Sequence, residues 1–213
     1  MKALSDCYLY TFVDTAYLHG RNPADIARQL CDGGSDIIQL RAKRESRAEI
    51  VQLAEVILPV TRAAGVPLVI NDHAEIAQSI GAECVHLGQE DFFDAGLRHR
   101  SQLATVSSKL QLGLSSHGPQ QGRRAEEAGA DYVAVGPVFP TATKPGRTSC
   151  TLNYVEWAAA NLKVPWFAIG GITLKTIDEV LAAGARRACV VSAILNASDI
   201  ASTCREFKRR LRG

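Results

Sequence analysis

The segment DIIQLRAKRESRAEIVQLAEVILPVTRAAGVPLVIN (residues 36–71) places a long alanine-rich run between two short β-rich runs. DIIQLR at 36–41 and PLVIN at 67–71 have the length and composition of strands. The run at 48–65 has the spacing of an amphipathic helix and closes on a glycine, as many helices do. A strand, a helix and a second strand in this order predict two parallel strands joined by a right-handed crossover.

The same unit recurs along the whole chain. Further β-rich runs stand at residues 8–14, 84–88, 111–115, 131–136, 166–170 and 188–192. Helical segments AEIAQSIGA, GRRAEEAGA and TIDEVLAAGA each end on Gly-Ala just before the next strand. Eight such units in 213 residues predict an α/β fold, a (β/α)8 TIM barrel that forms a single domain over residues 1–213. A doubly wound parallel sheet is the alternative, although that fold rarely needs eight strands.

The composition excludes several classes of protein. Hydrophobic residues make up 46% of the chain and charged residues 22%, enough apolar material for a proper core. The formal net charge of +2 predicts no general attraction to nucleic acid or to a membrane surface. The six cysteines contain no C-x-x-C pair, which argues against a metal site built from thiolates. With no signal-peptide pattern and no long apolar run, we expect a cytoplasmic protein. A homo-oligomer is one alternative for its assembly.

In a TIM barrel the chemistry lies at the carboxyl ends of the strands, so the residues that follow each strand matter most. The end of the second strand runs into Gln39, Arg41 and Lys43, which stand at alternate positions and therefore point the same way. An amide and two cations on one side predict a binding site for a phosphate or diphosphate. A solvated basic edge is the alternative.

Carboxylates follow the third and fourth strands. Asn71 and Asp72 close the third, and Asp91 comes shortly after the fourth. Two carboxylates at adjacent strand ends could share Mg2+, which takes one or two carboxylates and fills its shell with water and phosphate oxygens. The alternatives are that Asp72 caps the following helix and that Asp91 is a turn residue.

The fifth strand ends in Ser115, Ser116 and His117. A serine close to a histidine suggests a nucleophile, but the G-x-S-x-G elbow is absent and no carboxylate is placed to orient the imidazole. We therefore expect Ser115 to hydrogen-bond a substrate. The other histidines follow no pairing pattern, and we expect satisfied or surface side chains at His73, His86 and His99.

The loop GPVFPTATKPG (136–146) crowds two hydroxyls and an ammonium between rigid turn-forming residues. Thr141, Thr143 and Lys144 lie there, after the sixth strand. The seventh strand ends in Gly170–Gly171 and the eighth in Val191–Ser192, each before a helix. Glycines allow close approach of backbone, and a phosphate site after strands seven and eight recurs in this fold. We therefore expect two anion sites with the threonine loop between them.

Several motifs together resemble one family. QLRAK (39–43), HLGQED (86–91), GPVFPTATK (136–144) and IGGI (169–172) resemble the thiamine phosphate synthases, and they occur in family order. The resemblance implies a TIM-barrel transferase of thiamine biosynthesis that requires Mg2+. It would join 4-amino-2-methyl-5-(diphosphooxymethyl)pyrimidine to 4-methyl-5-(2-phosphooxyethyl)thiazole, giving thiamine phosphate and pyrophosphate.

The resemblance also implies a role for each matching residue. The residues expected at the pyrimidine diphosphate are Gln39, Leu40, Arg41, Ala42, Lys43, Asn71, Ser115 and Lys144. Those expected to be catalytic are Arg41, Lys43, Ser115 and Lys144. Those expected at the thiazole phosphate are Thr141, Thr143, Gly170, Gly171, Val191 and Ser192. Asp72 and Asp91 would bind the Mg2+.

Two other functions fit parts of the pattern. A related barrel similar to thiazole tautomerase would use His117 as an acid or base and would need no metal. A non-catalytic barrel that binds a phosphorylated ligand would keep the phosphate loops. Neither function accounts for the pair Asp72 and Asp91, which is why we expect the transferase.

Overall fold

The computed structural model describes residues 2–103, 110–141 and 149–213, in which eight parallel strands close into a barrel. The strands are β1 (Leu9–Asp14), β2 (Ile37–Arg41), β3 (Leu68–Asn71), β4 (Cys84–Leu87), β5 (Gln111–Ser116), β6 (Tyr132–Val135), β7 (Trp166–Ile169) and β8 (Ala188–Cys189). Each strand pairs with the next in the sequence, and β8 returns to pair with β1. This closure confirms the predicted TIM barrel and excludes the doubly wound sheet, which is open.

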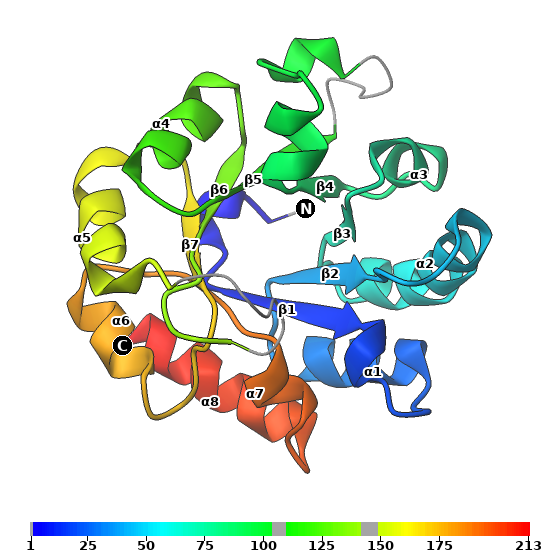
Figure 1. The fold of residues 1–213 in the computed structure, drawn as a ribbon. Coiled ribbons are helices and arrows are strands. Elements are labelled where there is room, and N and C mark those ends of the chain that lie inside the picture. Colours follow the sequence, from blue (N-terminus) through cyan, green and yellow to red (C-terminus); the bar gives the residue numbers. More distant parts are fainter. Residues whose placement is uncertain (1, 104–109, 142–148) are drawn as a thin grey trace.

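Helices surround the ring of strands (Figure 1). They are α1 (Pro23–Asp32), α2 (Arg47–Ala63), α3 (Ala74–Ser79), α4 (Pro119–Glu127), α5 (Thr151–Asn161), α6 (Ile177–Ala182), α7 (Ser192–Leu195) and α8 (Ile200–Arg212). Short helical turns complete the described elements: η1 (Leu4–Asp6), η2 (Thr15–Tyr17), η3 (Glu90–Asp94) and η4 (Arg100–Gln102). None of the helices in the described part of the chain has both the length and the apolar character of a membrane span.

Local signals explain where the elements begin and end. Ser46 and Glu49 form a capping box that satisfies free N–H groups at the start of α2. The last strand is shorter than its β-rich sequence predicts, because the chain leaves the sheet after Cys189. Val191 adopts a non-strand conformation (φ −112°, ψ −89°) and precedes α7 directly. Val191 and Ser192 therefore lie in the loop and helix start above the barrel.

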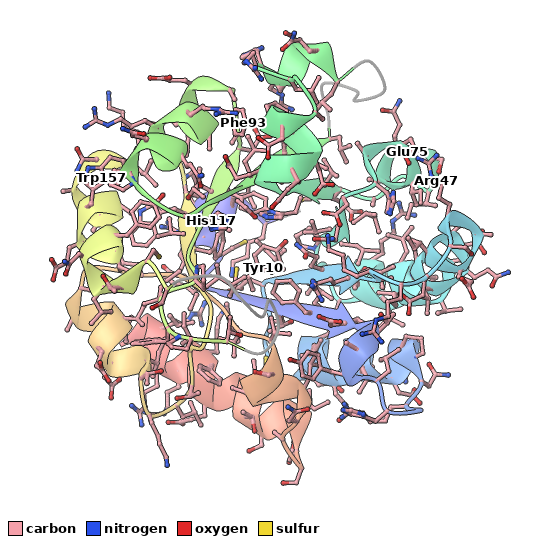
Figure 2. All side chains as sticks on the ribbon, in the orientation of Figure 1. Tyr10, Arg47, Glu75, Phe93, His117 and Trp157 are labelled. Carbon is pink, nitrogen blue, oxygen red and sulfur yellow. The ribbon has the colours of Figure 1, made fainter. Side chains whose placement is uncertain are left out.

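The barrel interior is filled by aromatic side chains. Tyr10 points into its middle (Figure 2) and meets the rings of Tyr132 and Phe167 edge to face, at centroid distances of 5.8 and 5.5 Å. The imidazole of His86 stacks on Tyr132 at 5.7 Å. These side chains form a floor under the carboxyl end of the barrel.

Asp36, just before β2, ties the opposite end of the barrel together. Its carboxylate accepts hydrogen bonds from the backbone N–H groups of Tyr8 (2.8 Å) and Leu9 (3.0 Å) and forms ion pairs with Lys2 and Lys208. Burial raises the pKa of Asp36, but these four donors outweigh that effect and leave the pKa below its ordinary value. The N-terminal segment, β1 and α8 thus meet on one charged group.

Replacing Asp36 with asparagine is expected to lower the free energy of unfolding by about 2 kcal/mol at pH 7, because the half-buried Lys2 and Lys208 lose their charge-assisted hydrogen bonds to it. The folded pKa lies below the unfolded value of about 3.9, so this stabilisation is complete above that value and is lost as the pH falls through the folded pKa. Burial also lowers the pKa of Lys208, but that shift acts only at alkaline pH.

Urea unfolding at neutral and at acidic pH measures this effect of Asp36. The matched control is Asp25→Asn, which removes an exposed i,i+3 pair with Arg28 and is expected to change stability by less than about 0.5 kcal/mol. Equal losses for the two variants at pH 7 would contradict the role given to Asp36.

Candidate active site

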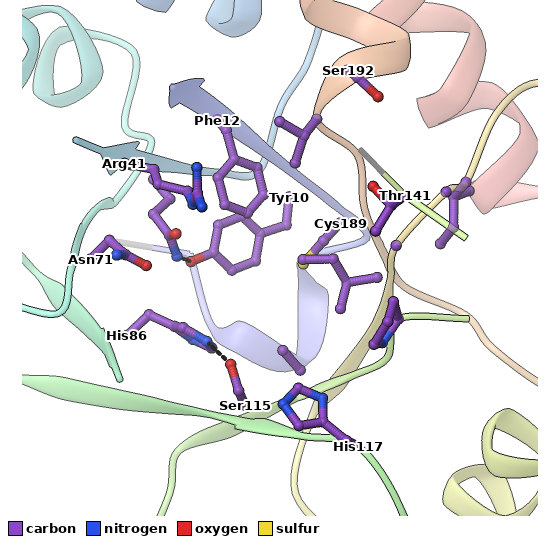
Figure 3. Close-up of a pocket in the computed structure, with 18 residues that line it drawn as sticks. Tyr10, Phe12, Arg41, Asn71, His86, Ser115, His117, Thr141, Cys189 and Ser192 are labelled. Carbon is purple, nitrogen blue, oxygen red and sulfur yellow. Dashed lines mark hydrogen bonds between the residues drawn. The ribbon is translucent and has the colours of Figure 1, made fainter. Parts of the chain in front are cut away.

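A cavity opens at the carboxyl end of the barrel (Figure 3). It brings together many of the residues singled out from the sequence: Gln39, Arg41, Asn71, Ser115, His117, Thr141, Gly170, Gly171, Val191 and Ser192. They come from loops and strand ends that are far apart in the chain. The cavity is also lined by residues that the sequence did not single out for the site: Tyr10, Phe12, His86, Ala134, Pro137, Ile169, Ile172 and Cys189.

Arg41 is held in place by a buried acid. Its Nη1 donates to Asp14 Oδ2 at 2.8 Å, and the Asp14 side chain is only 1% exposed. The other oxygen of Asp14 accepts from the backbone N–H of Ala16 at 3.0 Å. This leaves the guanidinium positioned at the cavity with further N–H groups for an anion. Asp14 ends the first strand, so the strand-end argument that found Asp72 could have found it as well.

Asp72 lies at the centre of a second polar group. It forms an ion pair with Lys43, and Nδ2 of Asn71 donates to its Oδ2 at 2.5 Å. The alternative in which Asp72 caps the following helix is wrong: α3 starts at Ala74 behind His73, and no side chain caps it. Asp72 instead has a left-handed backbone (φ 66°), which is strained for a residue other than glycine.

Asp91 and Asp72 approach each other closely enough to hydrogen-bond. Although much of the Asp91 side chain is exposed, the protein around its carboxyl group removes enough water to raise its pKa. The charge of Asp72 and the hydrogen bond to it raise the pKa further, against the opposing influence of Lys43 and the Gly88 backbone. Two carboxylates forced together in this way suit a divalent cation that neutralises both.

The donor set fits Mg2+ better than a transition metal. Among the described residues, no group of three or more His, Cys, Asp or Glu side chains is placed to hold a metal ion. A site with two carboxylates therefore has room for water and for ligand oxygens, which is the shell that Mg2+ prefers.

The structure places the remaining predicted residues as follows. Leu40 and Ala42 are buried and do not line the cavity, so only their backbone could face a ligand. Lys43 reaches the carboxylate of Asp72 beside the cavity. Thr143 and Lys144 lie outside the described residues.

The loops after β6 and β7 are joined by backbone hydrogen bonds, from Val138 N–H to Ile169 O (2.9 Å) and from Phe139 N–H to Gly170 O (3.0 Å). Gly170 and Gly171 both have positive φ (101° and 66°). A Cβ on Gly171 would lie 2.7 Å from the Phe139 Cβ. Only glycine allows these loops to pack so closely, and this contact positions Thr141 at the cavity.

The two histidines of the cavity are both hydrogen-bonded. Nδ1 of His117 lies 2.5 Å from the carbonyl oxygen of Gly136. His86 is buried and lies between the hydroxyls of Tyr132 (Nδ1, 3.2 Å) and Ser115 (Nε2, 2.9 Å). It is satisfied, as expected, but it also lines the cavity, which the sequence analysis missed. Strand alternation puts His86 on the same side of the strand as Gly88, but this pattern alone does not distinguish it from an ordinary core residue.

Comparisons with known proteins agree with this geometry. Residues 9–194 match the family model described as thiamine monophosphate synthase. The thiamine-phosphate synthase of Thermus thermophilus is 44% identical over 189 residues, 85% of each chain. That of Acidothermus cellulolyticus is 42% identical over 214 residues, 99% of this chain and 98% of the relative.

A solved structure extends the agreement to three dimensions. The thiamine phosphate pyrophosphorylase of Pyrococcus furiosus superposes with a TM-score of 0.86 at 25% identity, covering 99% of this chain and 98% of that one. The family model and the relatives span most of the sequence, including the strand ends that build the cavity. The chain belongs to the thiamine monophosphate synthase family.

Proposed function

We propose that this enzyme joins 4-amino-2-methyl-5-(diphosphooxymethyl)pyrimidine to 4-methyl-5-(2-phosphooxyethyl)thiazole, releasing pyrophosphate and forming thiamine phosphate. The observation that carries the proposal is the layout of the cavity. Cations and a carboxylate pair lie at the ends of β2 and β3 and in η3, while glycine-rich backbone lies after β7. Two phosphorylated substrates need two such places.

The diphosphate belongs on the side of Arg41 and Lys43. Both cations are held by carboxylates in the free enzyme, Arg41 by Asp14 and Lys43 by Asp72. Preorganised cations stabilise charge that develops on a leaving diphosphate without reorganising during the reaction. Asp72 and Asp91 would hold Mg2+, which when bound supplies further neutralisation of the departing diphosphate.

Ser115 and Asn71 would orient the pyrimidine diphosphate, and Lys144 would meet the departing group from the loop after β6. The electron-rich aminopyrimidine can stabilise a methylene cation, so that the diphosphate leaves before the thiazole nitrogen attacks. No protein nucleophile is required for this reaction.

The thiazole phosphate belongs on the opposite side of the cavity. Thr141, Gly170 and Gly171 line it there together with Val191 and Ser192. Thr143 would add a second hydroxyl. Glycine backbone can come close to an anion and donate N–H groups, and loops after the last two strands of TIM barrels often do so. The acceptor would thus be bound by neutral donors, away from the cations that hold the diphosphate.

Omission of single components tests the proposed reaction. We expect thiamine phosphate, identified by mass spectrometry, only when the protein, both substrates and Mg2+ are present. Conversion of the thiazole alone would instead support a tautomerase that uses His117. Binding of either phosphate without any turnover would support the non-catalytic barrel.

Replacing Arg41 or Lys43 with methionine is expected to raise the KM for the pyrimidine diphosphate about 10- to 100-fold, because each variant loses a charge-assisted hydrogen bond. The KM for the thiazole phosphate should stay within about twofold, because the acceptor lies on the other side of the cavity. Steady-state kinetics with each substrate varied in turn measures both constants. Arg44→Met removes the exposed neighbouring cation and is the matched control. Equal rises for both substrates would contradict this division of the cavity.

The broader predictions from the sequence stay predictions. They are a cytoplasmic location, a single domain over residues 1–213, no nucleic-acid or membrane partner, and a homo-oligomer as one alternative.

A further inference from the structure

A chain of buried hydrogen bonds crosses the barrel beneath the cavity. Nε2 of Gln39 lies 2.6 Å from the Tyr10 hydroxyl, which lies 3.0 Å from the Tyr132 hydroxyl. Tyr132 is 3.2 Å from Nδ1 of His86, and Nε2 of His86 is 2.9 Å from Ser115 Oγ. The members come from β2, β1, β6, β4 and β5, and Figure 3 shows the last link, between His86 and Ser115, among the side chains that line the cavity. The chain therefore connects the two sides of the proposed diphosphate site.

A glycine makes room for the middle of this chain. Gly113 is the register partner of His86 on one side and of Tyr132 on the other. A Cβ on Gly113 would lie 2.1 Å from the Cζ atom of Tyr132, well inside any allowed contact. Gly113 is not in the left-handed region, so it is the missing side chain that matters. The phenol passes over this glycine to reach the imidazole.

The donor and acceptor at each link of this hydrogen-bond chain can be assigned by counting the hydrogens that each group carries. Gln39 Nε2 donates to Tyr10, so the one hydrogen of the Tyr10 hydroxyl is available for Tyr132. Tyr132 then gives its own hydrogen to Nδ1 of His86, which must be unprotonated. The ring hydrogen therefore sits on Nε2 and is donated to Ser115 Oγ. Ser115 is left with its hydroxyl hydrogen to give.

If Tyr132 donated to Tyr10 instead, one buried hydroxyl hydrogen would have no acceptor. Tyr10 would then accept from both Gln39 and Tyr132, and its own hydroxyl hydrogen would have no acceptor among the described residues. Tyr10 is only 1% exposed, and a buried hydroxyl without an acceptor is strongly disfavoured. When Tyr10 donates to Tyr132, each hydrogen within the barrel has an acceptor, and the hydroxyl hydrogen of Ser115 remains for the cavity.

We propose that this chain fixes His86 as the Nε2–H tautomer and so turns the Ser115 hydroxyl into an obligatory donor to the diphosphate. Tyr10, Tyr132 and His86 are then positioning residues that act through Ser115. The inference rests on the proposed function, which places the diphosphate against Ser115. If the hydrogen bonds ran in the opposite direction, the Ser115 hydroxyl would donate to His86. Ser115 would then present only lone pairs to phosphate oxygens, which are acceptors themselves.

The tautomer can be measured without any substrate. In ligand-free protein labelled with 15N in histidine, long-range 1H–15N spectra distinguish protonated from bare ring nitrogens, and His86→Gln identifies the signals among the five histidines. We expect a protonated Nε2 and a bare Nδ1 for His86 in the wild-type protein. A protonated Nδ1, alone or together with Nε2, would overturn the proposal.

Variants test the consequence for Ser115. Tyr132→Phe is expected to release His86 into a mixture of tautomers and to raise the KM for the pyrimidine diphosphate about 10-fold, the effect of losing one buried hydrogen bond. Gly113→Ala should act in the same direction by displacing the Tyr132 ring. Tyr154→Phe is the matched control, because it removes another buried hydroxyl, bonded to the neighbouring Ser116 at 2.7 Å, and should change neither readout.

The outcomes separate this inference from the proposed function. If His86 is the Nε2–H tautomer but the protein makes no thiamine phosphate, the direction of the hydrogen bonds is supported. The proposed reaction is then refuted. Turnover with an Nδ1–H tautomer, or an altered tautomer in Tyr132→Phe with an unchanged KM, would refute the role given to the chain.

Discussion

Replacing Asp91 with alanine is expected to lower Mg2+-dependent release of pyrophosphate about 10³-fold, the upper end of the loss seen when one preorganised electrostatic group is removed. Asp91 and Asp72 contact each other, and the loss of water around Asp91, together with the charge of Asp72, raises the pKa of Asp91. A cation between them removes that repulsion, whereas a single carboxylate would hold it far more weakly. Pyrophosphate release as a function of Mg2+ concentration measures the effect, and circular dichroism checks that the fold survives.

Asp94→Ala is the matched control for Asp91. Asp94 is an exposed carboxylate in the same helical turn, and its removal should leave the Mg2+ dependence unchanged. The double variant Asp72→Ala, Asp91→Ala decides the assignment. Turnover at the wild-type rate with both carboxylates gone would contradict the metal site.

Replacing Gly171 with alanine is expected to lower kcat/KM for the thiazole phosphate about 100-fold, because the backbone N–H groups of Gly170 and Gly171 are the proposed preorganised donors to that phosphate. The new Cβ would lie 2.7 Å from both the Cβ of Phe139 and the carbonyl oxygen of Pro140. The two loops must then separate, which moves the backbone at the proposed phosphate site. Steady-state kinetics with the thiazole phosphate varied gives the constant.

Gly65→Ala separates this clash from backbone strain. Gly65 has almost the same φ (68° against 66°), and nothing lies within 4 Å of a Cβ built on it. Both variants carry the left-handed penalty of about 1–2 kcal/mol and should lower the melting temperature. Only Gly171→Ala should lose affinity for the thiazole phosphate. Equal kinetics for the two variants would contradict the placement of that phosphate.

Hydrophobic pattern and glycine position were enough to predict the barrel. The eight β-rich runs contain the observed strands, apart from Ser116 at the end of β5, because parallel strands are buried on both faces and therefore stand out as apolar runs. The length of β8 was predicted less well. Val191 is as apolar as its neighbours, and only the pairing with β1 and β7 decides that the strand stops at Cys189.

Charged residues at strand ends could be found from the sequence, but the polar side chains deeper in the barrel could not. Arg41 and Asp72 stand out because a buried strand ends beside them. Tyr10 and His86 lie one layer deeper, where a polar side chain resembles an ordinary core residue until its partners are known. His86 becomes informative only when Tyr132 reaches it across Gly113, a contact between strands far apart in the chain.

The most direct test of the proposed metal and phosphate sites is a crystal structure of the protein with Mg2+, thiamine phosphate and pyrophosphate. We predict pyrophosphate beside Arg41 and Lys43 with the cation on Asp72 and Asp91, and the phosphate of thiamine phosphate against Gly170–Gly171. Pyrophosphate bound at the glycines, or a cation bound away from the two aspartates, would contradict this prediction.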